Sequence, residues 1–149
     1  MKEAIITVGI SASGKSTWAR EFCSQSPGFY IIERDEIRQA IFKEKTGDDF
    51  IWRKWRWKWE DEVTNLQWEL ISECAITPQV KGIVISDTNL NQKRNDEMVL
   101  KLYKLGFNAS FRYFDIDVNE AIKRDRLRGK NTVGSGVIRK QFSQFELLT

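Results

Sequence analysis

The sequence contains no histidine, and only two cysteines and two prolines occur among its 149 residues. Without an imidazole, His-based catalytic triads and His-based zinc sites are excluded. Any chemistry must therefore use carboxylates, lysine, arginine, backbone amides or a bound ion. Cys23 and Cys74 lie far apart and form no CxxC pair, so we expect two reduced thiols among apolar side chains.

Long hydrophobic runs are also missing. No segment approaches the ~20 apolar residues that a membrane-spanning helix needs, and the N-terminus shows no signal-peptide cleavage pattern. We therefore expect a cytoplasmic protein that has no membrane partner. The 41% of hydrophobic residues is enough for one packed domain over residues 1–149, and the net charge of +3 favours an anionic partner without identifying it.

Short apolar segments alternate along the chain with segments of helical period. We expect strands at residues 4–8, 29–32, 82–86 and 108–114. We expect helices at residues 17–25, from 35 onward, at about 48–74, and at 92–105, 119–128 and 136–147. This alternation predicts an α/β fold with a mostly parallel four-stranded sheet flanked by helices on both faces. No repeat, linker or low-complexity tract divides the chain.

Residues 9–16 satisfy the pattern G-x-x-x-x-G-K-S between a predicted strand and a predicted helix, which is the setting of a phosphate-binding P-loop. Lys15 would place a charge on the β- and γ-phosphates of ATP, and the Ser16 hydroxyl would bind Mg²⁺. A plain glycine-serine turn is the alternative, and the flanking elements argue against it. We expect the nucleotide to contact Gly9, Ser11, Ala12, Ser13, Gly14, Lys15, Ser16 and Thr17.

The P-loop alone does not separate kinases from GTPases, motor ATPases or switches, but polar clusters after the second and third strands narrow the choice. Asp35 could accept a proton from an attacking hydroxyl, and Arg38, one helical turn on, could hold a substrate phosphate. Asp87 could serve the metal or orient the substrate. A helix cap for Asp35 and a turn for Asp87 are the alternatives, which the P-loop at the same sheet edge disfavours.

Four cations occur within residues 124–130, after the fourth predicted strand. In a phosphotransferase such a segment can close over ATP and place an arginine on the charge that develops at the γ-phosphate. The alternative is a solvated helix end whose cations interact with the helix dipole. The sequence does not decide which arginine acts among Arg124, Arg126 and Arg128.

The order of these motifs resembles the kinase domain of bacteriophage polynucleotide 5′-hydroxyl kinases over essentially the whole chain. The matching segments are the P-loop, Arg34-Asp35-x-x-Arg38, Ser86-Asp87-Thr88-Asn89-Leu90-Asn91 and Arg124-x-x-x-Arg128-Gly129. The resemblance implies ATP-dependent phosphorylation of a 5′-OH end of DNA or RNA, in nucleic-acid repair. It also implies a general base at Asp35, a contact to the acceptor's 3′-phosphate at Arg38, acceptor-side roles for Asp87 and Thr88, and donor-phosphate contacts at Arg128 and, with less weight, Arg124.

One departure from that family concerns its C-terminal 3′-phosphatase domain, which the best-known phage enzymes carry and which this sequence does not contain. We therefore expect no 3′ end healing by this chain. Asp115 and Asp117 have the D-x-D spacing of that phosphatase, but we place them on the fourth strand, without the Gly-Thr that should follow, and interpret the match as coincidence. If a phage encodes the protein, the cytoplasm of the infected host is its expected location.

A tryptophan-rich segment at residues 51–59 interleaves aromatic residues with cations, a composition that can bind single-stranded nucleic acid. Trp52, Trp55 and Trp59 recur at helical spacing, so we favour a helix that packs in the core or forms a homo-oligomer over base contact. Trp57 lies off this stripe and is the best candidate for stacking. A small-molecule P-loop kinase and a non-catalytic nucleic-acid-binding module remain the alternatives to a polynucleotide kinase.

Overall fold

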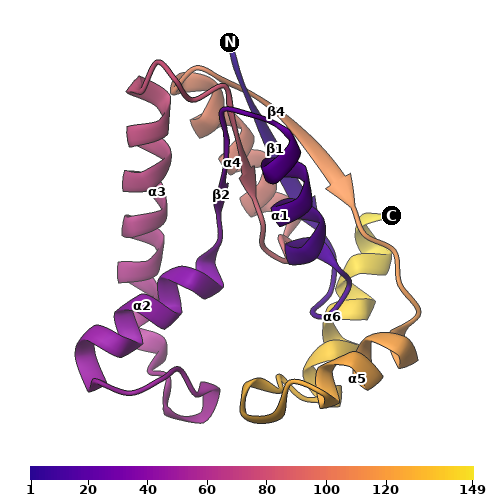
Figure 1. The fold of residues 1–149 in the computed structure, drawn as a ribbon. Helices are drawn as coiled ribbons and strands as arrows, with labels where there is room; N and C mark the ends of the chain where they lie inside the picture. Colours follow the sequence, from indigo (N-terminus) through magenta and orange to yellow (C-terminus); the bar gives the residue numbers. More distant parts are fainter.

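Four parallel strands form the centre of the structure, a computed structural model that describes residues 1–149 (Figure 1). The strands are β1 Lys2–Val8, β2 Phe29–Ile32, β3 Gly82–Ile85 and β4 Phe107–Tyr113, and their order in the sheet is β2-β3-β1-β4. This confirms the predicted α/β fold with a parallel four-stranded sheet.

The register of the sheet brings the carboxyl ends of its strands to one edge. Ile32 of β2 pairs with Ile85 of β3, Ile85 pairs with Ile6 of β1, and Val8 pairs with Tyr113 of β4. Because all strands run in the same direction, the segments that follow them begin at this edge, where open α/β sheets place their ligands. In Figure 1 it is the lower edge of the sheet.

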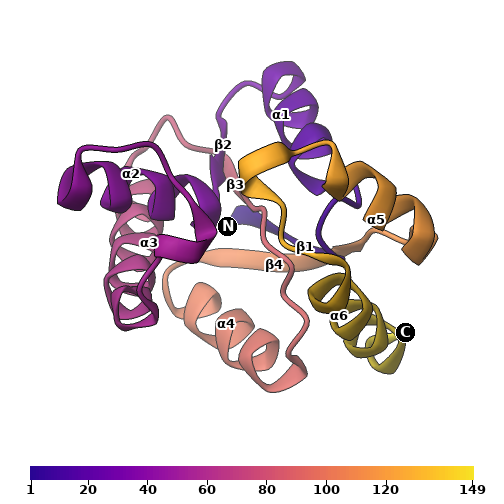
Figure 2. The ribbon, with the colours of Figure 1, turned by 90° about the horizontal axis from the view of Figure 1, so that it is seen from below.

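Six α-helices surround the sheet on both faces. They are α1 Lys15–Gln25, α2 Arg34–Thr46, α3 Glu60–Ile76, α4 Gln92–Lys104, α5 Val118–Arg126 and α6 Ser135–Leu148. Figure 2 shows α1 on the opposite side of the sheet from α4. None of these helices has both the length and the hydropathy that crossing a membrane requires.

The core on one face of the sheet joins α3 and α4 to the strands. Ile71 of α3 and Leu102 of α4 are fully buried in one cluster with Ile6 and Ile83. On the other face α1 packs through aromatic rings. Phe22 meets Phe29 edge-to-face with their ring centroids 5.2 Å apart, and the ring centroids of Trp18 and Phe114 are 5.7 Å apart. Burial of such rings is a main source of folding free energy, and here it fixes α1, and hence the P-loop, against the sheet.

The predicted helix at residues 48–74 is wrong in its first part. Two short 3₁₀ turns, Trp52–Lys54 and Trp57–Trp59, precede α3, and the backbone is extended at Trp55 and Arg56 between them. Trp55 is 5% exposed, and its indole N–H donates to Oε2 of Glu60 at 2.9 Å. Residues spaced three and four apart can lie in short 3₁₀ turns as well as in one helix. Here the tertiary packing of the rings decides for the turns.

The placement of Asp115 and Asp117 on the fourth strand is also wrong. Strand β4 ends at Tyr113, and Asp117 is the N-cap of α5, where its Oδ1 accepts hydrogen bonds from the amides of Asn119 at 2.8 Å and Glu120 at 3.2 Å. A capping aspartate needs no catalytic explanation.

Candidate active site

The P-loop connects β1 to α1 and has the backbone geometry of an anion-binding turn. Gly14 adopts a left-handed conformation with φ of 95° at the N-cap of α1, and Ala12 is also left-handed with φ of 63°. A Cβ at Gly9 would lie 2.9 Å from the Ser13 hydroxyl and 3.0 Å from Cβ of Phe114, so only glycine fits there. The backbone amides at the N-terminus of a helix point outward along its axis, so the first amides of α1 point into the loop, where they can bind phosphate.

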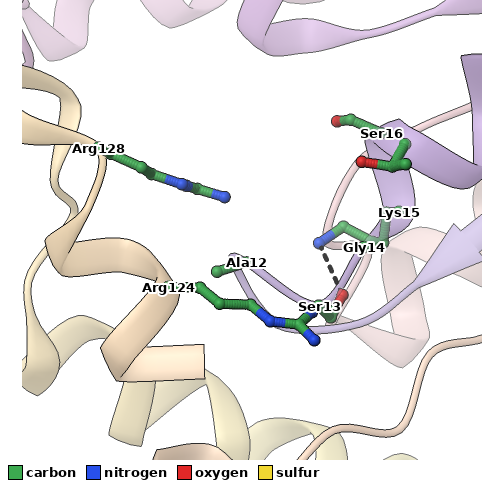
Figure 3. A pocket seen from close by; sticks show the side chains of 8 residues that line it. Ala12, Ser13, Gly14, Lys15, Ser16, Arg124 and Arg128 are labelled. Atoms are coloured by element: carbon green, nitrogen blue, oxygen red, sulfur yellow. Dashed lines mark hydrogen bonds between the residues drawn. The ribbon is translucent and has the colours of Figure 1, made fainter. Parts of the chain in front are cut away.

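A cavity of about 200 Å³ lies over this loop (Figure 3). Figure 3 shows Arg128 reaching toward Lys15 and Ser16 from across the cavity, and Arg124 of α5 pointing toward the P-loop. The structure thus brings together the two arginines and the loop that the sequence analysis proposed, and Arg126 does not line the cavity. The lining residues are Ala12, Ser13, Gly14, Lys15, Ser16, Thr17, Arg124 and Arg128.

Lys15 is buried inside the loop. Its Nζ donates to the carbonyl oxygen of Ile10 at 2.6 Å and to the hydroxyl of Ser13 at 3.4 Å. Burial lowers the pKa of Lys15 to about 8, although the carboxylates of Asp35 and Asp87 oppose the shift. A bound polyphosphate would supply the negative charge that this ammonium lacks.

Ser16 contacts a carboxylate that the sequence analysis did not include among the site residues. Its hydroxyl donates to Oε2 of Glu33 at 2.9 Å, and burial raises the pKa of Glu33 against the effect of this hydrogen bond. Glu33 directly follows β2, so its position at the carboxyl end of a predicted strand was the available signal. A serine hydroxyl beside a carboxylate offers the kind of oxygen ligands that Mg²⁺ prefers.

Asp35 and Arg38 lie together on the first turns of α2. Arg38 Nη1 is 2.7 Å from Oδ1 of Asp35, whose side chain is 61% exposed. Arg38 also donates twice to Glu60, at 3.0 and 2.8 Å, and Arg34 donates to the same carboxylate at 3.2 Å. Burial alone would raise the pKa of Glu60, but the hydrogen bonds and charges of the two arginines lower it. Glu60 thus holds Arg38 in place, a role that the sequence analysis missed.

Asp87, just after the end of β3, connects this strand to the start of α2 and to α3. Its Oδ1 accepts from the amide of Arg34 at 2.8 Å, and its Oδ2 accepts from Nε2 of Gln67 at 3.1 Å. Burial raises the pKa of Asp87 to about 6, although the backbone hydrogen bond and charge of Arg34 oppose this. Next to it, the carbonyl of Thr88 accepts from the amide of Gly9 at 3.0 Å. These two residues therefore fix the P-loop and the start of α2 to the end of β3.

The segment that carries Arg128 depends on Asp125, which the sequence showed only as one acid among cations. Asp125 is buried, and its two oxygens accept from the amides of Val133 and Gly134, each at 3.0 Å. These bonds close the connection between α5 and α6. A further missed residue is Gln141 of α6, whose Oε1 accepts from the amide of Ser11 at 2.8 Å.

A larger cleft of about 1090 Å³ connects the P-loop to the acceptor side. Its lining includes the predicted site residues Ser11, Ala12, Lys15, Ser16, Asp35, Arg38, Asp87, Thr88 and Arg128. Gly9 lines neither cavity. The predicted donor and acceptor residues therefore share one continuous surface at the carboxyl edge of the sheet.

A family model described as an AAA domain matches residues 5–148, which is nearly the whole chain. The chain belongs to this AAA-domain family. This AAA domain is 28% identical over 150 residues to a protein of Autographa californica nuclear polyhedrosis virus that is named as a bifunctional polynucleotide kinase/RNA ligase. The alignment covers 97% of the AAA domain and 21% of the viral protein, so the chain spans about a fifth of that relative's length.

Solved structures establish that the fold of the AAA domain is that of P-loop kinases. A chain of the Pnkp1/Rnl/Hen1 RNA repair complex matches with a TM-score of 0.77 and 22% identity, over 98% of the AAA domain and 44% of that chain. A gluconokinase from Sinorhizobium meliloti matches with a TM-score of 0.56 and 20% identity, over 95% and 74% of the two chains. The fold is therefore shared by proteins whose names indicate different substrates.

Proposed function

We propose that this AAA domain is an ATP-dependent polynucleotide kinase that transfers the γ-phosphate of ATP to the 5′-OH end of DNA or RNA. The observation that carries the proposal is the single cleft that joins the P-loop to the Asp35–Arg38 pair. A phosphate donor and a phosphorylated acceptor can meet there. The viral relative named as a polynucleotide kinase/RNA ligase supports the same reading.

On the donor side, the amides of the P-loop and the ammonium of Lys15 bind the β- and γ-phosphates of ATP. Arg128 extends toward the same place from across the cavity, where it can stabilise the charge that develops during transfer. Ser16 would hold Mg²⁺ together with nearby carboxylates, and the bound ion would neutralise phosphate charge. Glu33 orients the Ser16 hydroxyl until that ion is bound.

On the acceptor side, the 5′ oxygen attacks the γ-phosphorus in line with the bond to the β-phosphate, which breaks to release ADP. Asp35 accepts the proton of the attacking hydroxyl, and its exposure leaves its carboxylate accessible to an acceptor that enters the cleft. Arg38 binds a second phosphate of the acceptor. A small acceptor without such a phosphate has no use for Arg38, which favours a polynucleotide.

The test uses γ-labelled ATP and a 3′-phosphorylated oligonucleotide with a 5′-OH end, alongside nucleosides and sugars such as gluconate. Label on the oligonucleotide alone supports the proposal. Label on a sugar alone supports a small-molecule kinase instead, as the likeness to gluconokinase would suggest. Oligonucleotide binding without labelling of any acceptor supports a non-catalytic binding module.

Asp35→Asn should lower turnover by about two to four orders of magnitude, because a general base is lost while the shape of the side chain is kept. ATP binding should change little, since Asp35 does not line the cavity over the P-loop. The matched control is Glu36→Gln, which removes a neighbouring exposed carboxylate that pairs only with Arg20 at 3.4 Å. Equal turnover in the two variants would remove Asp35 as the base.

A further inference from the structure

Trp57 is the only one of the six tryptophans that is mostly exposed, at 70%. Its ring stacks on the ring of Trp52, with the centroids 6.1 Å apart and an interplanar angle of 26°. The outer face of an indole is a large flat apolar surface, and water is a poor environment for it. The Trp52–Trp57 pair therefore presents a preformed aromatic platform.

Core packing accounts for Trp52 but not for Trp57. The buried cluster of the region is built on Phe42, Trp55 and Val63, and Trp52 and Trp59 pack against it. Trp57 is absent from that cluster, and its only close aromatic neighbour is Trp52. The fold therefore holds Trp57 in a defined position without burying it.

The platform lies in the same cleft as the acceptor residues. Trp52 and Trp57 line the cleft together with Asp35 and Arg38. Arg38 connects the two groups, because its guanidinium lies 5.4 Å from the ring centre of Trp52 and 2.7 Å from Oδ1 of Asp35. A nucleotide whose phosphate is bound by Arg38 would have its base within reach of the rings.

The segment that carries the platform is cationic, although its four cations lie outside the lining of the cleft. The segment 50–59 contains four cations and no acidic residue, and all four cations are exposed. These are Arg53, Lys54, Arg56 and Lys58. Alternation of exposed cations with an exposed aromatic ring is the composition by which proteins bind single-stranded nucleic acid, with phosphates on the cations and bases on the ring.

We propose that Trp57, supported by Trp52, stacks on a base of a single-stranded polynucleotide acceptor. The proposal rests on the proposed function and names the feature that selects a polynucleotide over a small alcohol. Stacking accepts every base, so this subsite adds affinity without sequence preference. The sequence analysis favoured packing or self-association for the tryptophan-rich segment as a whole, and it named Trp57 as the best candidate for stacking.

The test compares wild type, Trp57→Ala and Trp57→Phe for binding a fluorescently labelled, 3′-phosphorylated single-stranded oligonucleotide with a 5′-OH end. Trp57→Ala should weaken binding about five- to hundredfold and raise the KM for the oligonucleotide by a similar factor. Trp57→Phe should retain most of the affinity, and kcat and the KM for ATP should not change. Tyr103→Ala is the matched control, because Tyr103 is an exposed aromatic residue on α4 outside the cleft.

Equal oligonucleotide affinity in Trp57→Ala and Tyr103→Ala would overturn the proposal. So would a dimeric wild type that becomes monomeric in Trp57→Ala with unchanged oligonucleotide affinity, since the ring would then serve self-association. Binding is measured apart from turnover, which separates the two proposals. If wild type phosphorylates no polynucleotide but binding still depends on Trp57, the stacking subsite stands and the proposed function fails.

Discussion

Replacing Glu60 tests whether its ion pairs with Arg34 and Arg38 stabilise the fold or contribute as little as an exposed ion pair does. Its carboxylate accepts four hydrogen bonds, of which two come from Arg38, one from Arg34 and one from the indole of Trp55. Glu60→Gln keeps the size of the side chain but removes the charge. It also places an amide NH₂ where two of these donors require an acceptor.

The magnitude follows from the burial of the partners. Exposed ion pairs contribute about 0–1 kcal/mol, whereas loss of one partner of a buried pair costs about 3–5 kcal/mol. Glu60 and Arg38 are 24% and 16% exposed, which is between these limits. We therefore expect Glu60→Gln to lower the free energy of unfolding by about 2–3 kcal/mol, and the melting temperature by roughly 5–10 °C for a chain of this size.

The assay is urea unfolding followed by tryptophan fluorescence, with melting measured by calorimetry. Glu62→Gln on the same helix is the control, because Glu62 is half exposed and pairs only with Lys45 at 2.9 Å. That variant should lose less than about 0.5 kcal/mol. Equal destabilisation in the two variants would refute the argument that the Glu60 cluster is a structural element.

Two further predictions concern the donor side. The kcat/KM for ATP should fall about tenfold per pH unit above pH 8, because the pKa of Lys15 is lowered to about 8 and the charged form is lost as the pH rises through that value. A pH profile that stays flat to pH 10 would contradict this. Asp125→Asn should cost about 1–3 kcal/mol in urea unfolding and raise the KM for ATP, because one amide of Val133 or Gly134 loses its acceptor and the segment bearing Arg128 loosens. The exposed Asp96→Asn is its control, and equal effects would argue against an anchoring role for Asp125.

Much of the fold could be predicted because its strands are short, rich in β-branched or aromatic residues, and bounded by glycine or polar residues. The predicted second strand, 29–32, has the same limits in the structure. Strand β1 begins earlier than predicted, at Lys2, because Lys2 and Glu3 pair with Phe107 and Asn108 of β4. Such pairing is a long-range interaction, which local composition does not encode.

The tryptophan-rich segment shows where periodicity fails. Spacings of three and four fit one helix, but they fit short 3₁₀ turns joined by extended residues equally well. The choice is made by contacts with α2 and by the bond from Trp55 to Glu60, which the sequence does not reveal.

The residues of the candidate site also fall into two groups, those that the sequence predicts and those that only the folded structure reveals. The P-loop is a local motif, and its residues were found by spacing alone. Glu60, Asp125 and Gln141 were missed because each acts on a residue or segment that only the folded chain brings near. Gln141, for example, contacts Ser11 from the last helix.

The position of β1 in the sheet has a consequence for synthesis. Its two neighbours are β3 and β4, so β1 has no pairing partner until residues 82–85 have been made, and its second partner follows with residues 107–113. At ordinary translation rates that delay is on the order of ten seconds. The phosphate-binding loop, which follows β1, therefore gains its final shape only after a much later part of the chain has been made, and a chain that ends before β3 should not retain nucleotide.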